Sequence, residues 1–132
     1  MHSASFIRPL LFFEGPAFAL ASAVHRGWFI PGYQHARAAT PEGVIAAVLF
    51  AGLILTWVVP KRAWGIGVAV QAFAIVGTLA GVGFVLAGIG PQTVPDIVYH
   101  VAMLVVLIGG AIAFMRTRIA SAGRNGAFER RD

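Results

Sequence analysis

Residues 12–26 read FFEGPAFALASAVHR, an apolar run with an acid near one end and a histidine near the other. On an ideal α-helix Glu14, Phe18 and His25 share one face, and the two ionisable groups lie about 16 Å apart along the axis. Ionisable side chains within a membrane are costly and face a bundle interior, a cavity or a partner. The run therefore predicts a membrane helix whose inward face carries two polar positions with apolar residues between them.

The overall composition agrees with a membrane protein. Of the 132 residues, 58% are hydrophobic and 11% are charged, whereas soluble domains have about a quarter of their residues charged. At about 20 residues per crossing, the length accommodates four spans with little left over. We expect an all-α integral membrane four-helix bundle with short loops and no separate soluble domain.

Three turn signals divide the chain into four apolar stretches. These signals are Pro31-Gly32, Pro60-Lys61-Arg62 and Gly90-Pro91. Thr40-Pro41-Glu42 resembles a helix start, with an N-cap, a proline and an acid in the first turn. Thr93 and Asp96 resemble a capping box. We predict a four-span domain over 1–115, with spans at about 9–30, 42–59, 64–89 and 96–115. The basic tail, 116–132, is expected to be cytoplasmic and either disordered or a frayed helix.

The net charge of +5 arises from basic residues at the span ends, which is not the basic groove that binds nucleic acid, so no nucleic-acid partner is expected. Two arginines, Arg26 and Arg37, fall on one side of the predicted bundle. The other eight basic residues fall on the opposite side: Arg8, Lys61, Arg62, Arg116, Arg118, Arg124, Arg130 and Arg131. The positive-inside rule then predicts a bacterial-type cytoplasmic (inner) membrane protein with both termini in the cytoplasm.

Several chemistries are excluded by the residues that the chain lacks. There is no cysteine, so disulfides, thiolate metal sites and cysteine nucleophiles do not occur. No serine or threonine lies in a nucleophile motif, and no span carries the paired carboxylates of acid–base catalysis. We do not expect the chain to be an enzyme by itself.

One predicted polar layer lies near the outer side and contains His25, His35, Glu42, Asp96 and His100. His25 and His100 should each lie about 7 Å below a helix end, at matched depth. Two converging imidazoles could bind haem axially, or hold copper or zinc with His35 as a third ligand. Asp96, one turn before His100, is placed to orient it. The simpler alternative is that these histidines bond to each other, to Asp96 or to carbonyls at helix ends.

The second predicted layer lies nearer the inner side and contains Glu14, Gln71 and Thr56. A structural interpretation has Glu14 hydrogen-bonded to an amide and to the carbonyl that Pro16 leaves free. A functional interpretation makes Glu14 a proton or cation exchange site with Gln71 and Thr56 as polar partners. Phe18 would exclude water between this layer and His25.

Gly77-x3-Gly81 in the third span is a small-xxx-small pattern, which lets membrane helices approach closely. The pattern could pack against another span, a second subunit of a homodimer or a flat ligand. Partners are therefore expected to be the lipid bilayer and either a second copy or a larger membrane complex.

Ser22-Ala23-Val24-His25-Arg26 resembles the Ser-x-x-His-Arg stretch of succinate dehydrogenase membrane-anchor subunits. In that family the serine and the arginine help to bind quinone, so the resemblance implies a quinone or haem site. It covers five residues, and this chain has neither the Ser/Thr-Gly that follows in the family nor its three-span count.

Three functions are left open. The first is binding of a redox cofactor or metal, namely haem, quinone, copper or zinc, through the outer histidine layer. The second is proton-coupled transport or a channel based on Glu14. The third is a role as an accessory subunit of a larger membrane complex.

Overall fold

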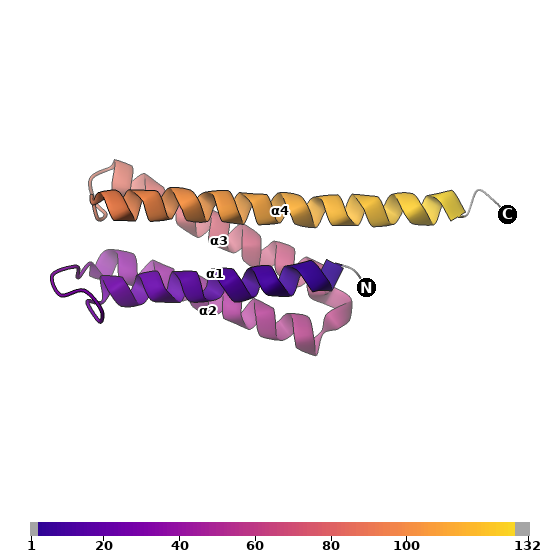
Figure 1. Ribbon diagram of the computed structural model, residues 1–132, viewed down its shortest axis with the longest axis horizontal. Helices are drawn as coiled ribbons and strands as arrows, with labels where there is room; N and C mark the ends of the chain where they lie inside the picture. The colour runs from indigo at the N-terminus through magenta and orange to yellow at the C-terminus, as the bar shows by residue number, and fades with distance from the viewer. Residues whose placement is uncertain (1–2, 129–132) are drawn as a thin grey trace.

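The fold consists of four long helices. The computed structural model describes residues 3–128 and is shown in Figure 1. Its elements are α1 (Ser3–His25), α2 (Ala36–Val58), the short 3-10 helix η1 (Pro60–Arg62), α3 (Ala63–Leu86) and α4 (Val94–Phe128). Four segments are long and apolar enough to cross a membrane: Phe6–His25, Ala36–Val58, Pro60–Leu86 and Val94–Arg116. The predicted all-helical fold with four candidate spans is confirmed.

The connections separate the two ends of the bundle. The loops 26–35 and 87–93 lie at one end, and η1 lies at the other with the N-terminus (Figure 1). The C-terminal part of α4 extends from this second end. We call these the loop end and the terminus end.

Helix α1 ends at His25, earlier than the predicted end near Ile30, because Gly27 terminates it. Gly27 has a φ of 77°, in the left-handed region that glycine adopts without a steric penalty. The N–H of Gly27 donates to the carbonyl of Val24 at 2.8 Å, and that of Trp28 donates to Ala23 at 3.1 Å. These two bonds form a Schellman motif. His25 consequently lies where the helix meets the loop, and not five residues inside the span.

Helix α2 begins six residues before the predicted start. Its N-cap is His35, and Pro41 lies inside the helix. Thr40 does not cap the helix, because its hydroxyl donates to the carbonyl of Ala36 at 3.3 Å. Glu42 is therefore in the second turn of α2, where it is buried at 5% exposure, and not in an exposed first turn.

The other boundaries differ less. Helix α1 starts at Ser3 and contains Pro9, which the sequence placed in a first turn. Helix α3 ends at Leu86. The predicted capping contact at the start of α4 is present, since the N–H of Asp96 donates to Oγ1 of Thr93 at 3.4 Å. Helix α4 continues to Phe128, so most of the predicted tail is helical, and 129–132 lie outside the described residues.

For helices that cross a membrane, tight packing between helices is the main stabilising term, because lipid is as apolar as the core. Leu11, Phe18, Leu49, Ala74 and Leu107 are among the buried side chains of the core. Large apolar side chains also cover the outside: Phe12, Phe13, Leu20, Val76 and Leu86 are all more than half exposed. This distribution is expected for a bundle surrounded by lipid.

The glycine seam of α3 faces the inside of the bundle. A Cβ built on Gly77 would lie 2.8 Å from Cδ1 of Ile45 on α2. A Cβ on Gly81 would lie 3.4 Å from Nε2 of His100 on α4. The two glycines thus let α3 approach both neighbours, and a homodimer through the same seam stays a prediction.

Candidate functional site

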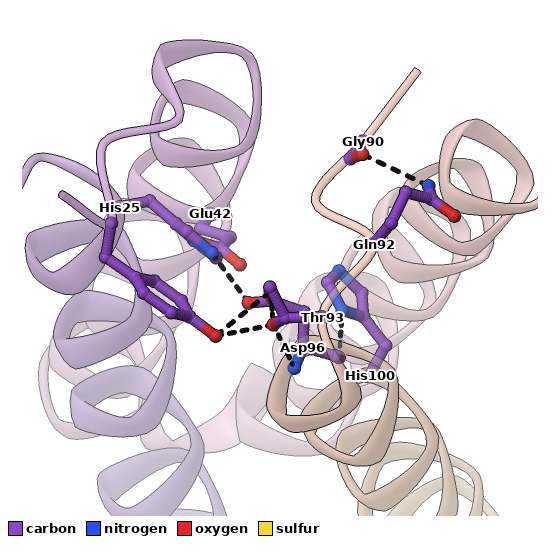
Figure 2. A network of polar contacts seen from close by, with 8 residues as sticks. His25, Glu42, Gly90, Gln92, Thr93, Asp96 and His100 are labelled. Carbon is purple, nitrogen blue, oxygen red and sulfur yellow. Dashed lines mark hydrogen bonds and ion pairs between the residues drawn. The ribbon is translucent and has the colours of Figure 1, made fainter. Parts of the chain in front are cut away.

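The main polar cluster is a buried histidine between two carboxylates. Nδ1 of His25 is 2.7 Å from Oε2 of Glu42, and Nε2 is 2.9 Å from Oδ1 of Asp96. The three residues come from the end of α1, the second turn of α2 and the start of α4 (Figure 2). They are 2%, 5% and 4% exposed. The cluster therefore joins three helices through groups that are almost wholly removed from solvent.

The two contacts of His25 limit where the protons of this triad can lie. An ionised carboxylate only accepts hydrogen bonds. Both contacts are thus made when both ring nitrogens of His25 carry protons and the triad has a net charge of minus one. If one of these two protons is removed, the imidazole and the two carboxylates share the single proton that remains. Oε1 of Glu42 is buried and has no partner among the described residues, so the triad has one unused acceptor.

The triad extends toward the loop end through Asp96. Oδ2 of Asp96 accepts hydrogen bonds from the hydroxyls of Thr93 and Tyr33, and these two hydroxyls also contact each other. The ring of Tyr33 stacks on that of His25, with centroids 6.2 Å apart. A polar cavity of about 290 Å³ adjoins this network and is lined by residues that include His25, Tyr33, His35, Thr93 and Asp96. The cavity lies among the residues of the two loops.

His100 also depends on Asp96, but through the main chain. Its Nδ1 is 2.7 Å from the carbonyl oxygen of Asp96, so Nδ1 donates and Nε2 of the neutral ring is an acceptor. The ring lies edge-on to Tyr99 at a centroid distance of 5.4 Å. The prediction that Asp96 orients His100 therefore applies to its carbonyl, while its carboxylate contacts His25.

An apolar cavity of about 350 Å³ lies beside the triad. Its apolar wall includes Phe18, Ile45 and Phe84, and the seam glycines line it as well. Glu42 and His100 provide polar groups at this wall, and Arg37 lines the same space. Glu42 and His100 thus add polar side chains to an apolar lining, and each has an acceptor outside its described hydrogen bonds: the buried Oε1 of Glu42, and Nε2 of His100, whose Nδ1 bonds to Asp96.

A second apolar cavity of about 310 Å³ reaches the triad from the other side, between α1 and α4. Its lining includes Leu20, Val24, Tyr99, His25 and Asp96. The hydroxyl of Tyr99 is buried without a partner among the described residues. Here the carboxylate of Asp96 and the ring of His25 are already paired with each other, so this cavity presents fewer free polar atoms.

The structure does not arrange the predicted metal ligands around one point. His35 donates its backbone N–H to the carbonyl of His25 at 2.8 Å, and its ring lines the polar cavity. Both ring nitrogens of His25 are occupied by carboxylates, and Nε2 of His100 faces Gly81. Within residues 3–128, no group of three or more His, Asp or Glu side chains has metal-binding geometry. Ligation by His25 would first have to displace a carboxylate.

The inner polar layer forms a separate cluster. Nε2 of Gln71 donates to Oε1 of Glu14 at 2.8 Å and to the carbonyl of Leu107 at 2.9 Å. Oε2 of Glu14 and Oε1 of Gln71 are buried and have no partner in the described part of the chain. Thr56, the other predicted partner, instead bonds its hydroxyl to the carbonyl of Leu53 in its own helix. The structure thus brings Gln71, but not the Thr56 hydroxyl, to Glu14.

Apolar core separates the two layers, as the sequence suggested. Phe18 is 2% exposed and packs edge-on against Tyr99, with centroids 6.2 Å apart. It belongs to the same core cluster as Leu49 and Met103. These side chains leave no polar route from Glu14 to the triad among the described hydrogen bonds.

The serine and arginine of the quinone-site resemblance have other contacts. The hydroxyl of Ser22 donates to the carbonyl of Ala39 at 2.7 Å, which ties α1 to α2. The guanidinium of Arg26 lies over the ring of Trp28 at 6.0 Å. Neither residue lines the cavities described above.

Two important residues were not among the site residues predicted from sequence. Glu42 was placed in the outer polar layer and at a helix start, but it was given no role as a ligand, and Tyr33 was expected to mark the membrane interface. The available signal was that Glu42 is an acid close to a long apolar run, which is costly unless it has a partner. Comparisons with protein-family models, curated proteins and solved structures found no match to this chain.

Proposed function

We propose that this protein is a membrane bundle that binds a small lipophilic molecule of the hydroquinone class in the 350 Å³ cavity between α2, α3 and α4. The observation that carries the proposal is that Glu42 and His100 line an apolar cavity, with Oε1 of Glu42 unpaired among the described residues and Nδ1, not Nε2, of His100 bonded to Asp96. Pockets with apolar walls and a few placed polar groups are typical of small-molecule sites.

Because the polar atoms proposed for the site are hydrogen-bond acceptors, they favour a ligand that donates hydrogen bonds. Two acceptors match a ligand that donates, such as a hydroquinone with its hydroxyl groups. An oxidised quinone, which only accepts, would leave both protein acceptors unpaired. A lipophilic cation would also suit acceptors, but the guanidinium of Arg37 lines the same cavity and would repel it. The neutral donor is therefore favoured.

The shape of the cavity suits an aromatic ring with a tail. Gly77 and Gly81 leave a flat wall on α3, and Phe84 at the side of the cavity is 55% exposed. A ring could lie beside the side chains of Ile45 and His100, which pack over these glycines, while an attached chain passes Phe84 into lipid. Among the redox cofactors that the histidine layer suggested, haem and metals need a ring nitrogen of His25, whereas a hydroquinone leaves the triad intact.

The proposed setting is a cytoplasmic membrane of the bacterial type with the loop end outside. Arg8, Lys61, Arg62 and Arg116 lie toward the terminus end, and Arg26 and Arg37 toward the loop end. The positive-inside rule supports this orientation. The ligand cavity would then lie in the outer half of the membrane.

The proposal is tested by binding of a fluorescent short-chain hydroquinone to the purified full-length protein in nanodiscs. Loss of one hydrogen bond, worth about 0.5–1.5 kcal/mol, should weaken binding by roughly two- to tenfold in His100→Leu. The control is Val76→Ala, which removes a lipid-facing side chain of α3. Equal affinities for the wild type, His100→Leu and Val76→Ala would overturn the proposal.

Glu42→Gln offers a sharper variant. With both ring protons of His25 in place, its amide oxygen accepts from Nδ1, and the amide NH₂ takes the position of Oε1, which replaces an acceptor by a donor. The preference should shift from hydroquinone toward the oxidised quinone. An optical spectrum of the same sample, oxidised and reduced, checks the competing cofactor, because a stoichiometric haem band would redirect the site to haem.

A second candidate function is proton-coupled transport through Glu14. It is favoured by the fully buried carboxyl group, which has one oxygen bonded to Gln71 and one oxygen without a partner. In liposomes, Glu14→Gln should abolish proton-coupled uptake or export while the protein remains folded. Unchanged flux in this variant would remove the candidate.

A further inference from the structure

The triad adjoins a cavity at each of its two carboxylates, the 350 Å³ cavity at Glu42 and the 290 Å³ cavity at Asp96. Glu42 lines the ligand cavity; its Oε1 is buried and has no partner among the described residues, and its Oε2 contacts His25. On the far side of the ring, Oδ1 of Asp96 contacts His25, and Oδ2 contacts the hydroxyls of Thr93 and Tyr33. Each carboxylate thus uses one oxygen toward His25 and presents the other away from it.

We propose that this series, Glu42, His25, Asp96 and then Thr93 with Tyr33, is a proton relay that joins the ligand cavity to the polar cavity at the loop end. The inference rests on the proposed ligand site, because the relay would exchange protons with that site. It assigns His25 the role of proton carrier, and assigns Asp96 the role of passing protons to water in the 290 Å³ cavity.

The relay step moves one proton and no electrons. The step starts when the proton between Nδ1 of His25 and Glu42 lies on Oε2 of Glu42, so that the ring is neutral. This proton then transfers to Nδ1 while the proton on Nε2 transfers to Oδ1 of Asp96. The ring stays in place and has the same charge before and after. Asp96 then gives a proton to a water of the polar cavity, and Glu42 is left as a carboxylate. Distances of 2.7 Å and 2.9 Å are within the range in which such transfers occur.

The groups that face His25 are those that the relay uses. Glu42 approaches from α2, Asp96 from α4, and the ring of Tyr33 stacks on it from the loop. The apolar 310 Å³ cavity between α1 and α4 also reaches His25, and its lining includes Tyr33 and Tyr99. The competing route is direct entry of water through the rim of the ligand cavity near Arg37, which is exposed.

Ligand affinity gives a readout of the charge on Glu42. A hydrogen bond to an ionised carboxylate is about twice as strong as one to a neutral group. Protonation of Glu42 should therefore release part of the bound hydroquinone. The time course of release after an acid pulse then reports how quickly protons reach Glu42.

The experiment uses full-length protein in proteoliposomes that hold the fluorescent hydroquinone. Equilibrium binding is measured first for every variant, and the pH outside is then lowered within milliseconds. With the loop end outward, the wild type should respond promptly. Asp96→Asn, which keeps the size of the side chain but cannot pass a proton, should respond at least tenfold more slowly. Asp96→Glu should recover part of the rate.

The control is Gln92→Ala, which changes the same polar cavity outside the relay and should respond like the wild type. His25→Gln, which keeps a hydrogen-bond donor between the two carboxylates but cannot carry a proton, provides a second slow variant if Asp96→Asn does not fold. A wild-type rate in an Asp96→Asn protein that still binds hydroquinone would overturn the relay and favour entry near Arg37. Failure of the wild type to bind hydroquinone would instead refute the proposed function, and the relay with it.

Discussion

His25 at the end of α1 and Asp96 at the start of α4 are 71 residues apart in the sequence, and their side chains meet at 2.9 Å. The same ring contacts Glu42 of α2 at 2.7 Å. One buried imidazole therefore holds three helices together at the loop end. Its loss should affect stability as well as any function of the site.

His25→Ala should destabilise the bundle by about 3–5 kcal/mol, because it leaves two carboxylates buried without their common partner. Unfolding in mixed detergent micelles, followed by circular dichroism, measures the change. His35→Ala is the matched control, since the His35 side chain makes no capping hydrogen bond. Equal stabilities for the two variants would show that the triad does not stabilise the fold.

Gly81→Ala should weaken hydroquinone binding by roughly three- to tenfold. The new methyl group would lie 3.4 Å from Nε2 of His100 and would occupy the flat wall of the ligand cavity. Gly83→Ala is the control, because a Cβ there has no neighbour within 4 Å. Isothermal titration of both variants checks the prediction. Tighter binding by Gly81→Ala would place the ligand elsewhere.

Gln71→Leu should cost about 1–3 kcal/mol, because it removes the hydrogen-bond donor of the buried Glu14 carboxyl group. Thr56→Val should cost less than about 1 kcal/mol, since the Thr56 hydroxyl bonds only within its own helix among the described contacts. The two are compared by thermal unfolding. If Thr56→Val lost more stability than Gln71→Leu, Thr56 would be a partner of Glu14, as predicted from the sequence.

Single cysteines test the orientation, because the chain has none of its own. Gln34→Cys in the loop 26–35 and Lys61→Cys in η1 are both at exposed positions. In intact cells, a membrane-impermeant maleimide should label Gln34→Cys and leave Lys61→Cys unlabelled until the cells are opened. The reverse pattern would place the ligand cavity in the inner half of the membrane.

The sequence predicted the spans because apolar length alone sets the number of crossings. The helix ends were harder to predict. Trp28 and Ile30 continue the apolar run, yet Gly27 stops α1 before them. Pro41 favours a helix start, but α2 already begins at Ala36. In both cases the helix end depends on the geometry of the loop between α1 and α2, and the local preferences of single residues do not determine that geometry.

The candidate site was only partly predictable for a related reason. Depth along a helix follows from residue number, so His25, Asp96 and His100 could be assigned to one layer. Which side chain pairs with which depends on how the helices rotate about their axes. The spacing of Asp96 and His100 favoured a contact within α4, but the Asp96 carboxylate turns to His25 and uses its carbonyl for His100. The pairing of Glu42 depends on the same rotation.

The most direct test of the ligand site compares a short-chain hydroquinone with its dimethyl ether, which has the same ring and no donor. Both are titrated into the wild-type protein in nanodiscs. We expect the hydroquinone to bind at least tenfold more tightly, because only its hydroxyls can donate to Glu42 and His100. Equal affinity for the two compounds would contradict a site defined by these two acceptors.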